Sequence, residues 1–109
     1  MAEAHLPAVS FHSLDPFRLN RLLKSTRDAF SNPDYLARLS EDQKYHLSAV
    51  FNDRNNFSKM VDHYRQRRSR AGSVWGGVIT LNDRDDLDDQ IIKKLREQAR
   101  NEMGFVLTI

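Results

Sequence analysis

The chain has 109 residues, of which 39% are hydrophobic and 29% are charged, and it contains no cysteine. This length suits one domain with a single modest core, and the apolar content is too high for a disordered tail. The lack of cysteine excludes disulfides, thiolate catalysis and cysteine–zinc sites, while 17 basic and 15 acidic residues leave a net charge of only +2.

The first residues show neither the basic start nor the apolar stretch of a secretory signal. No segment approaches the roughly 18 consecutive apolar residues of a membrane span. We therefore expect a cytoplasmic protein, in agreement with the missing cysteines. The excess of arginine over lysine favours a bacterial or phage source.

The N-terminal third predicts a short strand and then a helix. Residues 1–7 are expected to be flexible, and alternation of Val9 and Phe11 with polar residues predicts a strand near 8–12. Asp15 is a good N-cap and Pro16 suits the first helical position. Apolar residues then recur at helical spacing until segment 31–33, where a proline ends the helix. This stripe consists of Leu19, Leu22, Leu23, Thr26 and Phe30.

Three further helices are predicted before residue 72. Asn32 caps a short helix, and Ser40 with Gln43 forms a capping box for the next. The polar run 52–56 predicts a break after which Asn56 caps a fourth helix, although one long helix is the alternative. The apolar faces of the third and fourth helices consist of Leu47, Val50, Phe51, Phe57, Met60, Val61 and Tyr64.

The last third predicts a strand at 75–81, a helix from about 86 to 103 ended by Gly104, and a strand over 105–109. The connection is long enough for a parallel crossover. The expected fold is therefore α+β and mostly helical, with about four N-terminal helices followed by a strand–helix–strand unit. Because the last strand carries no charge, it is either central in the sheet or pairs with another chain, which favours a homodimer.

Two charged runs of opposite sign flank the predicted strand at 75–81. Cations in the last turn of a helix are favoured by the helix dipole, and so are carboxylates in the first turn. The acidic run 83–89 fails the ligand spacing of a calcium loop. The two runs can also meet each other, within one chain or across a dimer. The basic run is the candidate nucleic-acid surface, and its arginines are Arg65, Arg67, Arg68 and Arg70.

No catalytic or metal-binding motif is evident. The four histidines show no HxxxH spacing, the glycines form no phosphate loop, and no serine lies in a nucleophile elbow. We therefore expect no enzymatic activity, no cofactor and no metal site.

Small size, several amphipathic helices and the uncharged last strand favour a regulatory protein that binds and inhibits or sequesters a protein partner. An anti-activator of a transcription factor and a phage-type host inhibitor are examples of this class. Nucleic-acid binding through the arginine run is the alternative. The apolar stripes are core by default, and a stripe left uncovered would form an interaction groove. The candidate docking residues are Leu19, Leu22, Leu23, Phe30, Phe51 and Tyr64.

Overall fold

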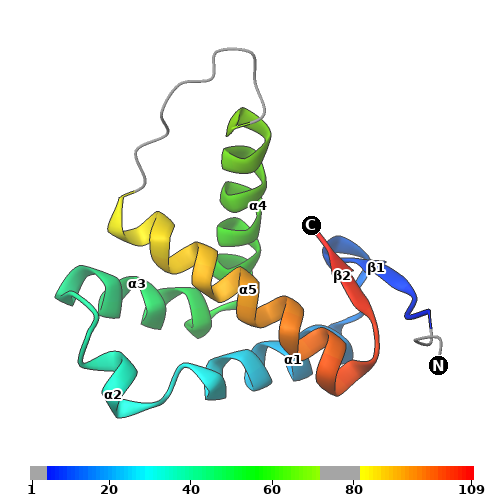
Figure 1. Ribbon diagram of the computed structural model, residues 1–109, viewed down its shortest axis with the longest axis horizontal. Helices are drawn as coiled ribbons and strands as arrows, with labels where there is room; N and C mark the ends of the chain where they lie inside the picture. The colour runs from blue at the N-terminus through cyan, green and yellow to red at the C-terminus, as the bar shows by residue number, and fades with distance from the viewer. Residues whose placement is uncertain (1–4, 72–81) are drawn as a thin grey trace.

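The computed structural model describes residues 5–71 and 82–109, which form a mostly helical structure with a small two-stranded parallel sheet (Figure 1). This confirms the predicted predominance of helix. In chain order the elements are β1 (Ala8–Ser10), the 3₁₀ turn η1 (Phe11–Ser13), α1 (Pro16–Ala29), α2 (Pro33–Leu36), α3 (Glu41–Asn52), α4 (Arg54–Ala71), α5 (Asp83–Met103) and β2 (Val106–Thr108).

The first three α-helices begin where their capping residues predict. The Asp15 carboxylate accepts a hydrogen bond from the Arg18 amide at 2.8 Å, at the start of α1. At the start of α3, the Ser40 hydroxyl accepts from the Gln43 amide while the Gln43 side chain accepts from the Ser40 amide. Each bond satisfies an amide that has no partner inside its helix, so the local sequence alone determines these starts.

Two predicted helix starts are wrong. The break before α4 is the single residue Asp53, whose carboxylate accepts from the Asn55 amide at 2.7 Å, so Asp53 caps the helix rather than Asn56. The extended backbone of Asp53 also excludes one long helix here. Helix α5 begins at Asp83 instead of about 86, because the Asn82 side chain caps it and its first-turn aspartates are favoured by the helix dipole.

The sheet joins the two ends of the described chain. Strand β2 pairs in parallel with β1, with Val9 opposite Leu107. The predicted strand at 75–81 lies outside the described residues, so the expected strand–helix–strand unit is only partly matched. One edge of β2 is therefore covered by β1, and Phe105 and Leu107 are buried in the core.

Helix α5 is the centre of the core. It packs against α1, α3, α4 and β2, and in Figure 1 it runs across the molecule, past α4, toward the turn that precedes β2. Its buried apolar face consists of Leu87, Ile91, Ile92, Leu95 and Ala99. Full burial of a large aliphatic side chain contributes about 1.5–3 kcal/mol, so this face contributes strongly to the stability of the fold.

No helix in the described ranges combines the length and the apolarity that crossing a membrane requires.

A substitution at Gly104 tests the end of α5. Gly104 has a φ of 71°, and a Cβ added there meets no atom within 4 Å, so the backbone conformation alone disfavours another residue. We expect Gly104→Ala to lower the free energy of unfolding by about 1 kcal/mol. Gly104→Asn should lower it less, because asparagine tolerates this left-handed region. Urea unfolding measures both, and equal stability of the alanine variant and the natural protein would contradict this account.

Candidate functional site

The predicted docking residues lie mainly in the core. Leu22, Phe30 and Tyr64 are buried, so in this fold their side chains offer little surface to a partner. Leu19, Leu23 and Phe51 are partly buried and pack against the same core. The large hydrophobic side chains that are exposed among the described residues were not predicted, and they are Phe17, Tyr45 and Val106.

An apolar groove lies between the C-terminal end of α1, α2 and α3, with a volume of about 480 Å³. Its apolar lining includes two predicted docking residues, Phe30 and Phe51, whose ring centroids are 6.3 Å apart. Leu36 and Leu47 complete the apolar lining, and sequence reasoning did not assign either of them to a docking surface.

The rim of this groove is cationic. Among the described residues, Arg27 and Lys44 are the only charged ones that line it, and none of the lining residues carries a carboxylate. Lys44 donates to Glu41 at 3.2 Å, whereas Arg27 has no ion pair with any residue in 5–69 or 82–109. Arg27 is therefore a cation available to a negatively charged partner.

A second, smaller depression of about 190 Å³ adjoins the groove and shares Arg27, Phe51 and Asn52 with it. It adds the predicted docking residue Leu23 to the apolar surface. Its charged lining residues are Lys24, Arg27, Asp53 and Arg54. The two depressions together form a surface with an apolar floor and an excess of positive charge.

The basic and acidic runs meet within the monomer, as the sequence suggested they can. Arg67 is 9% exposed, and its guanidinium lies 2.6 Å from the Asp89 carboxylate and 3.4 Å from that of Asp85. Arg67 is therefore occupied inside the protein and is not available to a nucleic-acid phosphate. Of the other arginines in the run, Arg65 and Arg68 are exposed, and the side chain of Arg70 lies outside the described part.

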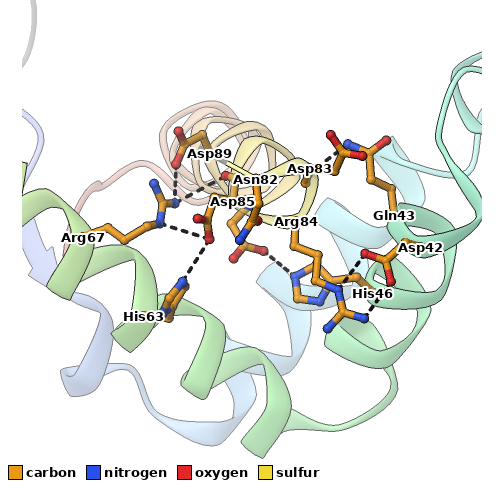
Figure 2. A network of polar contacts seen from close by, with 11 residues as sticks. Asp42, Gln43, His46, His63, Arg67, Asn82, Asp83, Arg84, Asp85 and Asp89 are labelled. Atoms are coloured by element: carbon orange, nitrogen blue, oxygen red, sulfur yellow. Dashed lines mark hydrogen bonds and ion pairs between the residues drawn. The ribbon is translucent and has the colours of Figure 1, made fainter. Parts of the chain in front are cut away.

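Two histidines contact the same acidic turns of α5. His63 Nε2 of α4 lies 2.9 Å from Asp85 Oδ1, and His46 Nε2 of α3 lies 2.7 Å from Asp88 Oδ1. Asp88 is only 2% exposed, while the side chain of His63 is 54% exposed. Figure 2 shows His63 and Arg67 reaching Asp85 from the same helix. Three helices thus converge on one polar cluster, which we call the His–Asp cluster: His46, His63, Asp85 and Asp88.

An exposed ion pair holds α3 against the start of α5. Arg84 donates to both carboxylate oxygens of Asp42, at 2.8 and 2.9 Å (Figure 2). This hydrogen-bonded guanidinium lowers the pKa of Asp42 below its ordinary value. Gln43 adds a hydrogen bond from its side-chain amide to the Asp83 carbonyl. Together with His46 and Asp88, these contacts fix the groove-lining helix α3 relative to α5.

The His–Asp cluster was missed because its members come from separate parts of the chain. His46 and Asp88 are 42 positions apart, and His63 and Asp85 are 22 apart, so no spacing within one helix reveals them. One signal was present: Asp88 lies three and four positions before Ile91 and Ile92, on the apolar face of its helix. A carboxylate at such a position requires a buried partner.

Comparisons with known protein families, with curated proteins and with solved structures find no match to this chain.

The buried position of Arg67 can be tested against its exposed neighbour. Arg67→Met removes the cation between Asp85 and Asp89, and we expect the free energy of unfolding to fall by about 2–3 kcal/mol. Arg68→Met is the same substitution at an exposed position, and it should alter the free energy of unfolding by less than about 0.5 kcal/mol. Urea unfolding of both variants provides the measurement. Equal effects at the two positions would show that Arg67 is not a buried partner of the acidic run.

Acid should abolish the contribution of the Arg84–Asp42 pair. Because the folded state lowers the pKa of Asp42, the pair stabilises the fold above the unfolded pKa of about 3.9. That stabilisation is lost as the pH falls through the lowered folded-state pKa. We expect Asp42→Asn to lower the thermal midpoint at pH 7 and to have a smaller effect near pH 3.

The control for this pH series is Asp28→Asn, an exposed aspartate whose side chain has no ion pair with the described residues. Its midpoint should follow that of the natural protein over the whole pH range. If Asp42→Asn lowers the thermal midpoint by the same amount at pH 7 and at pH 3, the stabilisation does not come from the ionised Asp42 in its pair with Arg84.

Proposed function

We propose that this protein is a non-enzymatic regulatory protein that binds a protein partner and sequesters it. The proposed contact is an amphipathic helical segment of the partner that carries acidic residues. The observation that carries the proposal is the apolar groove between α1, α2 and α3 with its cationic rim.

The apolar lining of the groove supports a helical occupant. Amphipathic helices bind in grooves by inserting apolar residues spaced three and four positions apart. Phe51, which is only partly buried, offers aromatic surface in this groove, and aromatic side chains are enriched among the residues that dominate binding energy. The adjoining depression extends the same surface along α1, which suits a segment longer than one helical turn.

The charge of the rim supports an acidic occupant. Arg27, Lys44 and, in the adjoining depression, Lys24 provide positive charge around the apolar floor. Complementary charge steers association and disfavours basic partners. Segments that alternate acidic and apolar residues are typical of activation regions in transcription regulators. Binding would cover such a segment, so an anti-activator is the regulatory role that we propose.

A pair of designed helical peptides tests the groove directly. One peptide carries leucines at helical spacing and glutamates on its polar face, and the other carries lysines in place of those glutamates. In a two-dimensional ¹H–¹⁵N NMR titration of the full chain, we expect the acidic peptide to shift the resonances of Arg27, Leu36, Lys44 and Phe51. The basic peptide should leave these resonances unchanged, because its lysines are repelled by the positive charges of the rim.

Charge reversal at the rim provides the matched variants. Arg27→Glu together with Lys44→Glu should weaken binding of the acidic peptide about tenfold or more, which corresponds to about 1.4 kcal/mol. Arg65→Glu makes one such reversal at an exposed position of α4 and should leave the affinity unchanged. Equal binding of the two peptides, or shifts away from the groove, would refute the proposed contact. Binding of a small apolar molecule but of neither peptide would refute the protein partner and assign a small ligand to the groove.

A further inference from the structure

Three potential metal ligands converge at the junction of α4 and α5. The ligand atoms of His63, Asp85 and Asp88 all lie within 4.8 Å of one another. Asp85 and Asp88 are i and i+3 on α5, so one face of the helix presents both carboxylates, and α4 supplies the imidazole. Both carboxylates are buried, whereas His63 is half exposed, which leaves the cluster open to solvent on one side.

Carboxylates outnumber guanidinium groups around this cluster. Asp85, Asp88 and Asp89 contribute three carboxylates, and Arg67 forms ion pairs with Asp85 and Asp89. The guanidinium lies closer to Asp89, at 2.6 Å, than to Asp85, at 3.4 Å, and Arg67 Nε makes no hydrogen bond. Arg67 therefore pairs with Asp85 as well as with Asp89. Asp85 and Asp88 are both buried, and a buried carboxylate requires hydrogen bonds or an opposite charge.

We propose that His63, Asp85 and Asp88 form a binding site for a divalent transition-metal ion, Zn²⁺ being the probe of choice. A divalent ion would add positive charge beside these two buried carboxylates. The ligand set of one imidazole and two carboxylates matches the preferences of zinc, whereas a site for Mg²⁺ or Ca²⁺ is built from oxygen ligands alone.

The present geometry requires only small side-chain movements to close around the ion. Zinc bonds to histidine nitrogen and carboxylate oxygen measure about 2.0–2.2 Å, which in a tetrahedron places ligand atoms about 3.4 Å apart. His63 Nε2 and Asp85 Oδ1 are 2.9 Å apart, and the remaining ligand distances stay below 4.8 Å. Three protein ligands leave the fourth position to water.

His46 acts as a positioning residue in this site. Its Nε2 lies 2.7 Å from Asp88 Oδ1, so as a donor it fixes the orientation of this carboxylate. Such hydrogen bonds to metal ligands orient them and commonly change metal affinity 10- to 100-fold. The site thereby links α3, α4 and α5 through one ion.

The chain contains a matched control for the exposed ligand. His12 contacts Asp62 at 3.0 Å, and both side chains are about as exposed as that of His63. Among the described residues, however, His12 and Asp62 do not belong to a group of three potential metal ligands. His12→Ala and His63→Ala therefore remove the same type of contact, and only the second removes a proposed ligand.

The experiment is calorimetric titration of the full chain with ZnCl₂ after treatment with a chelator, followed by thermal unfolding with and without the metal. We expect one zinc ion per chain, a higher unfolding midpoint in its presence, and no competition from millimolar Mg²⁺. Zinc affinity should fall more than tenfold in His63→Ala and remain unchanged in His12→Ala. Circular dichroism confirms that each variant is folded.

NMR of the natural protein provides a readout that needs no variant. The imidazole resonances of His63 should shift in proportion to added zinc up to one equivalent, and those of His5 and His12 should not. The proposal is overturned if zinc does not bind at micromolar concentration. It is equally overturned if His63→Ala binds as tightly as the natural protein, or if His12→Ala loses as much affinity.

Discussion

Burial of the apolar face of α5 is the constraint on which the rest of the structure depends. Leu87, Ile91 and Leu95 are completely buried, and α1, α3, α4 and β2 all pack on this one helix. These elements come from both ends of the chain, so the fold assembles around α5 rather than from neighbours in sequence. Since α5 is surrounded in this way, the polar residues of its first turns are also forced into contact with α3 and α4.

That enforced contact explains the polar cluster. Asp88 continues the apolar face of α5 toward its N-terminus, and Arg67 likewise continues the face of α4 one turn beyond Tyr64. When the two helices pack through their apolar faces, these charged positions are buried beside each other. Burial of a carboxylate requires hydrogen bonds or opposite charge. The overall net charge of +2 therefore conceals strong local charges that are matched across the helix interface.

The sequence predicted what local chemistry determines and missed what only long-range contacts determine. The starts of α1, α2 and α3 depend on capping residues within three positions, and these predictions were confirmed. The start of α4 was misplaced because Asp53 and Asn56 are both good caps, and the earlier one prevails. The pairing of β1 with β2, across almost the whole chain, and the meeting of His46 with Asp88 have no local signal.

The groove lies at the place where the helices that pack on α5 no longer bury all of their apolar side chains. Leu22 and Thr26 of α1 are completely buried, but the last turn of α1 lies against α2 and α3. Helix α2 is a single turn with no fully buried residue, so it covers the facing apolar surfaces only in part. The opposite side of α3 is held to α5 by the Asp42–Arg84 and His46–Asp88 contacts. Because His46 and Leu47 are adjacent in α3, the helix that lines the groove is also the helix that the His–Asp cluster holds against α5.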